Sequence, residues 1–180
     1  MIKGLSMFSN VGIAETYLKE IGIDIIIANE LDSNRANLYK ELYGKTKMIQ
    51  GDIRDKIDEI IEISLKNKVQ FLIATPPCQG FSIAGRRDYT DDRNDLIHYV
   101  LKAIDKINPE YVVIENVQNF LKHSITYGKY KGSIISVIKR KFSNKYNIEH
   151  GILNAKDYGV PQVRKRAFII MKKLGEPKFP

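Results

Sequence analysis

Apolar residues follow two alternating patterns along this chain. Short runs rich in β-branched residues, typical of buried strands, are separated by stretches in which apolar residues recur every three or four positions, as on one face of a helix. The strand-like runs are 2–8, 23–30, 45–53, 69–75 and 110–116. Strand and helix in regular alternation predict an α/β fold with a doubly wound, mostly parallel sheet.

Five helices are predicted between and after these strands, with capping and turn residues at several of their ends. Their positions are a stretch with Ala14, Tyr17, Leu18 and Ile21 at helical spacing that stops at Gly22; Asp32 or Ser33 to Leu42, stopped by Gly44; Lys56 to Lys66, with Ile57, Ile60, Ile61 and Leu65 inward; Leu96 to Ile107; and Ser133 to Phe142. Two further strand-like runs, 146–154 and 166–172, are joined by a loop and predict an antiparallel edge to the sheet.

Polar clusters stand where the predicted strands end. They read SNVG, NELD, GDI, TPPC and IENV. In doubly wound sheets ligands bind beyond the carboxyl ends of the strands, so these clusters predict one ligand-binding edge.

Composition narrows the class of protein. The 180 residues suit one domain, 1–180, and no apolar run approaches the roughly 20 residues that cross a bilayer. The N-terminus lacks the features of a signal peptide and a single cysteine excludes an internal disulfide, so we expect a cytoplasmic protein without membrane contact. The three histidines, His98, His123 and His150, have no metal-ligand spacing, and no metal site is predicted.

The charge balance points to a polyanionic partner. The formal net charge is +8 with a pI near 9.4, and much of the excess lies in the last third of the chain. Nucleic acid is the common partner of such a protein, although a solvated lysine-rich surface explains the same count.

The first two strand ends suggest an adenosine-containing cofactor. The sequence MFSNVGIAE resembles a glycine-poor dinucleotide loop around Gly12, and Glu30 follows at the distance where such folds place an acid on ribose hydroxyls. Asp52, after the third strand, is positioned to accept a hydrogen bond from an adenine amino group. Helix caps and turns are the alternative role for these acids. No P-loop lysine is present, and S-adenosylmethionine, which has no phosphate, fits.

The only cysteine, Cys78, lies in TPPCQGFS at the end of the fourth strand. Many free cysteines are inert core residues, but the flanking prolines, Gln79, Gly80 and Ser82 are not core-packing residues. At the end of a strand and near the start of a helix, nearby dipoles and cations can stabilise the thiolate form of a cysteine.

The ordered blocks PPCQGFS, IENV and PQVRKRAF resemble the signatures of the DNA (cytosine-5) methyltransferase family, and the resemblance extends over essentially the whole chain. It implies a Rossmann-like S-adenosylmethionine-dependent methyltransferase fold with S-adenosylmethionine as cofactor and duplex DNA as partner. The implied cofactor-binding residues are Phe8, Ser9, Asn10, Val11, Gly12, Glu30, Leu31, Asp52, Ile53, Pro77 and Leu96.

The resemblance also implies the roles of the reacting residues. Cys78 attacks C6 of a cytosine flipped out of the duplex, and Glu115 grips N3 and the exocyclic amine. Arg166 contacts O2 of the base, and Arg164 supports the catalytic loop. The segment 79–93 is the implied DNA-contacting loop, with Gln79, Gly80, Ser82, Arg86, Arg87 and Arg93 as candidates; solvated surface residues are the alternative for the three arginines.

The chain departs from the family pattern in two ways. It has Ser6 where the family usually has an aspartate, and Asn10 and Ile13 where it has glycines; Asn10 tolerates left-handed backbone angles. It also stops at GEPKFP, where family members continue into a target recognition domain and a last cofactor block. We therefore expect a split subunit that works with a second protein chain, or a truncated form.

Three functions remain open from the sequence. The first is methylation of cytosine C5 in DNA, as part of a bacterial or archaeal modification system. The second is the related cytosine-5 methylation of tRNA, which shares the proline–cysteine and ENV blocks; CQGFS favours the DNA branch. The third is a non-catalytic subunit that binds nucleic acid or assists assembly, for which Cys78, Glu115, Arg164 and Arg166 would not be needed.

Overall fold

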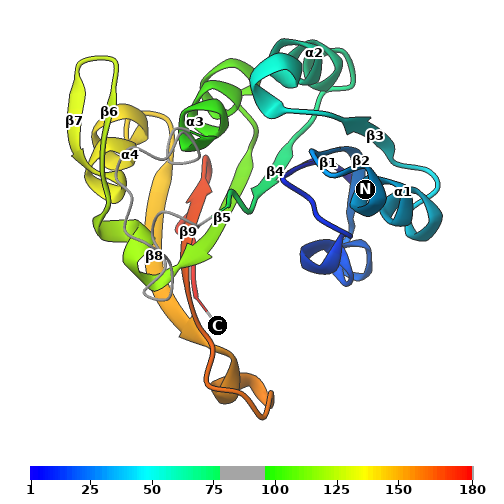
Figure 1. Ribbon diagram of the computed structural model, residues 1–180. Helices are drawn as coiled ribbons and strands as arrows, with labels where there is room; N and C mark the ends of the chain where they lie inside the picture. The colour runs from blue at the N-terminus through cyan, green and yellow to red at the C-terminus, as the bar shows by residue number, and fades with distance from the viewer. Residues whose placement is uncertain (78–95, 180) are drawn as a thin grey trace. The chain divides into compact units, whose positions relative to one another are not determined.

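The computed structural model describes residues 1–77 and 96–179 (Figure 1). By their contacts, these residues form two compact units. The first comprises residues 1–76 and 96–110, and the second comprises Pro77 and residues 111–179.

Four parallel strands form the centre of the first unit. They are β1 (Ile2–Met7), β2 (Ile23–Glu30), β3 (Lys47–Gln50) and β4 (Phe71–Ala74), in the order β3-β2-β1-β4. All four residues of β4 and the last four residues of β1 are buried, as expected for strands covered on both faces. Parallel pairing brings the carboxyl ends of these strands to one edge, where the loops after Met7, Glu30 and Gln50 begin.

Three α-helices belong to this unit: α1 (Ser33–Leu42), α2 (Ile53–Lys66) and α3 (Leu96–Ile107). The predicted cap of α1 is confirmed, since the Asp32 side chain accepts a hydrogen bond from the Arg35 N–H at 2.9 Å. Helix α3 has the predicted bounds, and its apolar stripe is buried. Helices α2 and α3 pack against each other.

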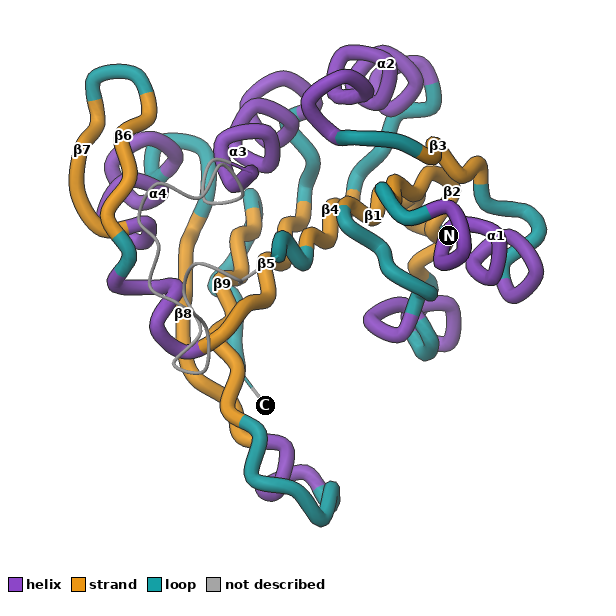
Figure 2. Tube along the Cα trace, viewed as in Figure 1, coloured by secondary structure: helices purple, strands orange, loops and turns teal. Residues whose placement is uncertain are grey.

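Helix α2 begins at Ile53, three residues before the predicted start at Lys56, and two further details of the helix predictions are wrong. The segment between β1 and β2 forms only two 3-10 turns, η1 (Ile13–Glu15) and η2 (Leu18–Ile21), which Figure 2 shows as short helical pieces. Tyr17 and Ile21 are about 70% exposed, because so short a segment presents no continuous apolar face to the sheet. In α2, Leu65 is exposed and Ser64 takes the buried position.

The second unit has three antiparallel strands, β5 (Tyr111–Val117), β8 (Asn147–Asn154) and β9 (Lys165–Lys172), with β9 in the middle. Helix α4 (Ile134–Phe142) buries four apolar residues at helical spacing and begins at the cap Ser133. A small hairpin of β6 (Ser124–Tyr127) and β7 (Tyr130–Ser133), which the sequence did not predict, packs on α4. Short 3-10 turns η4 (Gln118–Lys122) and η5 (Ala155–Tyr158) follow β5 and β8.

The strand order of the larger sheet is β3-β2-β1-β4-β5-β9-β8. The predicted α/β fold, with a mostly parallel sheet and an antiparallel edge, is confirmed. Within residues 1–77 and 96–179, no helix is both long and apolar enough to cross a membrane.

Candidate functional site

The loop that follows β1 has an unusual backbone. Phe8, Asn10 and Gly12 have φ angles of 59°, 53° and 83°, in the left-handed region that favours glycine. The expectation that Asn10 adopts such angles is confirmed. Because left-handed φ values cost energy in residues with side chains, the surrounding contacts must hold this loop in place.

Glu30, the last residue of β2, is one of these contacts. Its Oε2 accepts a hydrogen bond from the Asn10 N–H at 2.8 Å, and its Oε1 accepts one from the Asp32 N–H at 3.0 Å. The side chain is buried. An ionised carboxylate offers about four acceptor positions, so Glu30 keeps capacity for ribose hydroxyls while it holds the loop.

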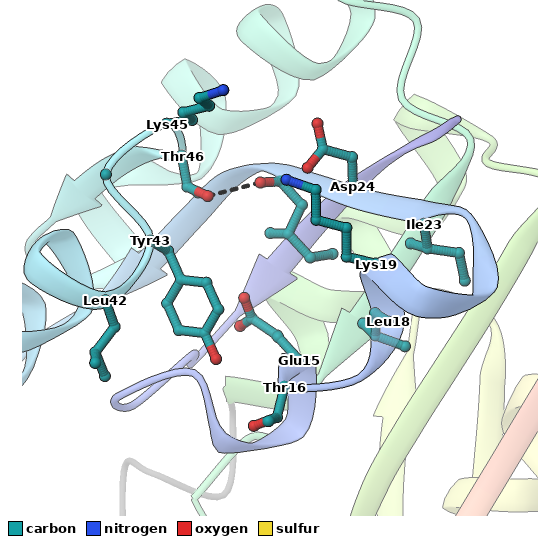
Figure 3. A pocket seen from close by; sticks show the side chains of 12 residues that line it. Glu15, Thr16, Leu18, Lys19, Ile23, Asp24, Leu42, Tyr43, Lys45 and Thr46 are labelled. Carbon is teal, nitrogen blue, oxygen red and sulfur yellow. Dashed lines mark hydrogen bonds between the residues drawn. The ribbon is translucent and has the colours of Figure 1, made fainter.

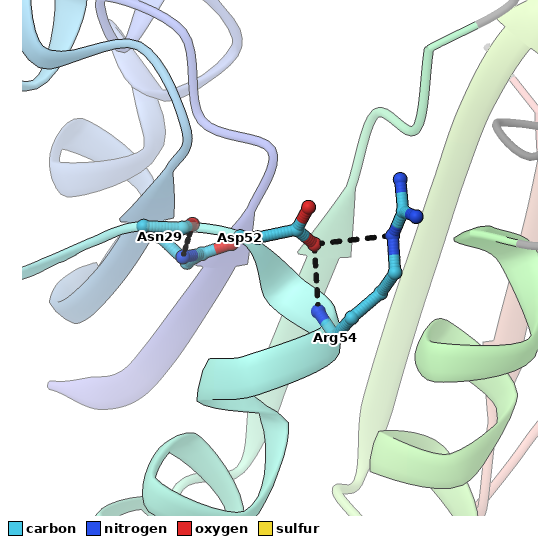
Figure 4. A network of polar contacts seen from close by, with 4 residues as sticks. Asn29, Asp52 and Arg54 are labelled. Atoms are coloured by element: carbon cyan, nitrogen blue, oxygen red, sulfur yellow. Dashed lines mark hydrogen bonds and ion pairs between the residues drawn. The ribbon is translucent and has the colours of Figure 1, made fainter.

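Asp52 lies at the end of β3 and begins helix α2 (Figure 4). Its Oδ1 accepts from the Arg54 N–H at 2.9 Å and lies 3.4 Å from Arg54 Nε. The helix-cap role that the sequence left open for Asp52 is thus present, and both contacts use the same oxygen. The Asn29 amide donates to the carbonyls of Ile49 and Gly51 at 2.8 and 3.1 Å, which joins the ends of β2 and β3.

The remaining predicted cofactor residues differ in exposure. Ser9 is buried, and its N–H donates to the Asn29 carbonyl at 2.9 Å. Leu31 is 62% exposed, whereas Ile53 and Leu96, the first residues of α2 and α3, are buried. Val11 and Pro77 are half-buried.

These residues suit S-adenosylmethionine. The three groups that would contact it are the loop that ends at Gly12, Glu30 at the end of β2 and Asp52 after β3. They suit an amino acid, a ribose and an adenine in that order, and none of these needs a phosphate site.

In the second unit, Glu115 and Arg166 form an ion pair. Glu115 Oε1 lies 3.0 Å from Arg166 Nε, and both side chains are about one-quarter exposed. In the antiparallel register Arg166 pairs with Val117, so Glu115 is its diagonal neighbour on the same face of the two strands. Burial raises the pKa of the Glu115 carboxyl above its ordinary value of 4.5, and the positive charges of Arg166 and Arg164 only partly oppose that rise.

Arg164 is held by its backbone. Its N–H donates to Asn154 Oδ1 at 3.1 Å, and its carbonyl accepts from the Ala155 N–H at 3.0 Å. The residue is exposed. The two arginines of the PQVRKRAF block therefore have different environments, and only Arg166 contacts Glu115 directly.

Seven predicted site residues lie outside the described residues: Cys78, Gln79, Gly80, Ser82, Arg86, Arg87 and Arg93. In the part of the chain that the structure does describe, no three His, Cys, Asp or Glu side chains gather as metal ligands.

Three residues near the loop were not selected from the sequence: Glu15, Tyr39 and Tyr43. All three contact the loop or each other, as described below. The spacing of the two tyrosines, one helical turn apart in YKELY, was visible, but nothing local indicated that they face the loop after β1.

Comparison with known proteins fits this geometry. A family model for C-5 cytosine-specific DNA methylases matches residues 2–179. The Type II methyltransferase M1.HgaI of Avibacterium volantium is 47% identical over 181 residues, which cover 97% of this chain and 51% of that protein. The Type II methyltransferase M.AquIA of Picosynechococcus is 32% identical over 192 residues, covering 99% of this chain and 75% of the relative.

Solved structures give the same result for the fold. One is a prophage-encoded Escherichia coli protein whose crystal structure is described as that of a DNA modification methyltransferase. Its TM-score is 0.74 at 29% identity, and the match covers 96% of this chain and 47% of that protein. Schizosaccharomyces pombe Dnmt2, at 21% identity, has a TM-score of 0.74 over 99% of this chain and 51% of its own, and is similar in fold.

The chain spans about half the length of the first curated relatives that it matches, 51% of one and 41% of the next. The match itself extends from residue 2 to residue 179. The chain belongs to the C-5 cytosine-specific DNA methylase family.

Proposed function

We propose that this chain transfers a methyl group from S-adenosylmethionine to C5 of cytosine in duplex DNA. The observation that carries the proposal is the Glu115–Arg166 pair, a half-buried carboxyl beside a guanidinium, in a chain that belongs to the DNA methylase family. A carboxyl with a raised pKa is suited to donate a hydrogen bond to a base nitrogen as negative charge develops on the ring.

Glu115 and Arg166 act on the base. The protonated Glu115 carboxyl donates to N3 of the cytosine, and the exocyclic amine donates to its other oxygen. Arg166 donates to O2 of the base, and its charge keeps Glu115 in place on β5. Arg164 supports this end of β9 through its backbone bonds.

Cys78 supplies the nucleophile. Its thiolate forms a bond from Sγ to C6 of the cytosine, and the electron pair of the C5–C6 double bond moves to C5, which becomes nucleophilic. Bound S-adenosylmethionine supplies the methyl group that C5 takes. Loss of the C5 proton to a base then restores the double bond as the Sγ–C6 bond breaks and the thiolate is released.

All the proposed cofactor contacts except Pro77 belong to the first unit. Glu30 binds the ribose hydroxyls, Asp52 accepts from the adenine amino group, and Leu96 and Ile53 contribute apolar contacts. The loop of Phe8, Ser9, Asn10, Val11 and Gly12 surrounds the amino-acid part, with Leu31 and Pro77 at the margins of the site. This assignment is supported by the hydrogen bond that joins the Asn10 N–H to Glu30 Oε2.

DNA as the partner is supported by the distribution of charge. Residues 117–148 contain seven Lys or Arg and no Asp or Glu, so they carry +7 of the formal +8. Cations so concentrated favour a polyanion. Gln79, Gly80, Ser82, Arg86, Arg87 and Arg93 lie outside the described residues and stay predicted DNA contacts. A second chain with a recognition domain, an accompanying restriction system and a cytoplasmic location also stay predictions.

The test is methyl transfer with labelled S-adenosylmethionine, followed by digestion of the DNA and identification of the labelled base. The chain is assayed alone and with the recognition half of a relative supplied as a second chain, on duplex DNA and on tRNA. We expect label in 5-methylcytosine from DNA. If only tRNA is labelled, the substrate is tRNA and not DNA. If nothing is labelled under any condition, the proposed catalytic function is contradicted.

A further inference from the structure

The loop from Phe8 to Gly12 is held on the side of α1 by a cluster of Glu15, Tyr39 and Tyr43, in which Tyr43 is half-buried and the other two are buried. Tyr39 and Glu15 are at most 4% exposed. Tyr39 lies in α1, and Tyr43 follows directly after the last residue of that helix. The two tyrosine rings have centroids 4.7 Å apart. Helical spacing of four residues places both rings on the same side of α1.

Tyr43 fixes the loop at Gly12 in two ways. Its hydroxyl donates a hydrogen bond to the Gly12 carbonyl at 2.8 Å. Its ring also occupies the space beside Gly12, since a Cβ on that residue would lie 2.2 Å from Tyr43 Cε2 and 3.0 Å from Tyr39 Cε2. Gly12 has no Cβ, so the rings approach the loop backbone more closely than any other residue would permit.

Tyr39 fixes the chain three residues later. Its hydroxyl donates to Glu15 Oε2, which ties the turn η1 to helix α1. Burial raises the pKa of the Glu15 carboxyl, and hydrogen bonds with the side chains of Ser6 and Tyr39 only partly oppose the rise. Through the Tyr39 hydroxyl, Glu15 is joined to α1 directly after the strained loop.

A cavity of about 340 Å³ borders this cluster (Figure 3). It is lined by Glu15, Thr16, Tyr43 and Thr46, among others, and Figure 3 shows the Tyr43 ring pointing toward the turn that carries Glu15. On the cavity side the ring has open space beside it, so close packing does not hold it there. The contact with the Tyr39 ring and the hydroxyl bond to Gly12 hold the ring from the other side.

We propose that Tyr39, Tyr43 and Glu15 are positioning residues for S-adenosylmethionine binding. They hold the loop from Phe8 to Gly12 in the left-handed conformation that receives the cofactor, without touching the reacting atoms. The proposal rests on the proposed function, because it takes S-adenosylmethionine as the ligand of this loop. A loop held in its binding conformation before the ligand arrives avoids an ordering cost on binding.

Tyr43→Phe is the sharpest variant, because it removes one hydroxyl and keeps the ring. We expect the Kd for S-adenosylmethionine, measured by calorimetry, to rise roughly three- to tenfold, the effect of losing one hydrogen bond. In the methyl-transfer assay KM for S-adenosylmethionine should rise by the same factor with kcat unchanged. The control is Tyr17→Phe, at a tyrosine that is 71% exposed in the same unit, which should leave Kd unchanged.

A second pair of variants separates positioning from folding. Glu15→Gln keeps an acceptor for the Tyr39 hydroxyl and should bind S-adenosylmethionine within about twofold of the wild type. Glu15→Ala removes the acceptor and should bind more weakly than Glu15→Gln, at a temperature where circular dichroism shows both to be folded. Glu15→Leu keeps most of the volume but removes the acceptor, and it should bind as weakly as Glu15→Ala. Binding by Glu15→Leu as tight as the wild type would show that the side chain serves only as volume in the core.

The outcomes distinguish the two proposals. If the wild type does not bind S-adenosylmethionine, the proposed function fails and this inference fails with it. If the wild type binds S-adenosylmethionine and both Tyr43→Phe and Glu15→Ala bind it as tightly as the wild type, only the positioning role is overturned. Weaker binding by both variants, with the Tyr17 control unchanged, supports it.

Discussion

The loop after β1 and the Glu115–Arg166 pair are held by different numbers of contacts. The loop from Phe8 to Gly12 is bonded to the end of β2 and to the hydroxyls of Thr75, just after β4, and Tyr43, just after α1. Among the described residues, Glu115 has one charged contact, Arg166, at 3.0 Å, and burial dominates the shift of its pKa. Several hydrogen bonds to its backbone fix the loop. For Glu115, by contrast, the main effect of the surroundings is to raise the pKa of its carboxyl.

This difference predicts different kinetic effects. Substitutions around the loop should act on the affinity for S-adenosylmethionine, because they loosen a shape that is formed in advance. Substitutions at Glu115 should act on the rate of the chemical step, because its proton is needed only as charge develops on the base. The predictions below run from the largest effect to the smallest.

Cys78→Ser should have the largest effect. Serine is a far weaker nucleophile than a thiolate, so we expect methyl transfer to fall by at least about three orders of magnitude. The Kd for S-adenosylmethionine should stay within about twofold of the wild type. Radiolabel transfer and calorimetry measure the two quantities, and activity within about tenfold of the wild type would rule out the thiol mechanism.

Glu115→Gln should lower kcat by about two to four orders of magnitude, the usual contribution of acid catalysis. The affinity for S-adenosylmethionine should not change. Glu149→Gln, at an exposed carboxyl on β8 of the same unit, is the matched control and should leave both values unaltered. An unchanged kcat in Glu115→Gln would mean that another group acts on N3.

Gly12→Ala should weaken S-adenosylmethionine binding by about tenfold or more, since the methyl group collides with Tyr43 and the residue has a φ of 83°. Gly22→Ala is a close control: its φ is 85°, yet no atom lies within 4 Å of the added Cβ. The control should lose some thermal stability but no affinity. Equal losses of affinity in the two variants would show that Tyr43 plays no part.

The raised pKa of Glu115 predicts a small pH effect on stability. Because burial raises this pKa in the folded state above 4.5, the protonated form favours folding. The corresponding stability is fully present below about pH 4.5 and is lost as pH rises through the folded-state pKa. Urea unfolding at several pH values should show this decline in the wild type and a flatter profile in Glu115→Gln. Parallel profiles would contradict the assignment.

Much of the fold was predictable because its signals are local. Helix α3, with apolar residues at i, i+3 and i+4, has the predicted bounds, and the dense β-branched run of β2 became a buried strand. The β6–β7 hairpin was missed because its four-residue strands show no clear alternation of apolar and polar positions. The segment after Gly12 had helical spacing, but Tyr17 and Ile21 remained exposed and only Leu18 is half-buried, so no apolar face of a helix formed.

The candidate site was predictable where a motif carries the residue, as for Glu30, Glu115 and Arg166. The cluster of Glu15, Tyr39 and Tyr43 was not, because its contacts join residues 24 and 31 positions apart. Likewise, the bond between Asn10 and Glu30 depends on the parallel pairing of β1 and β2 rather than on either local sequence.

The most direct test of the central claim is covalent trapping on DNA that contains 5-fluorocytosine. Fluorine at C5 prevents the final elimination, so an enzyme that has attacked C6 and methylated C5 stays bound through its nucleophile. We predict an adduct, found by mass spectrometry after incubation with S-adenosylmethionine and a recognition chain, on the peptide that contains Cys78. An adduct on another residue, or methylation of ordinary cytosine without any adduct on the fluorinated DNA, would contradict the account.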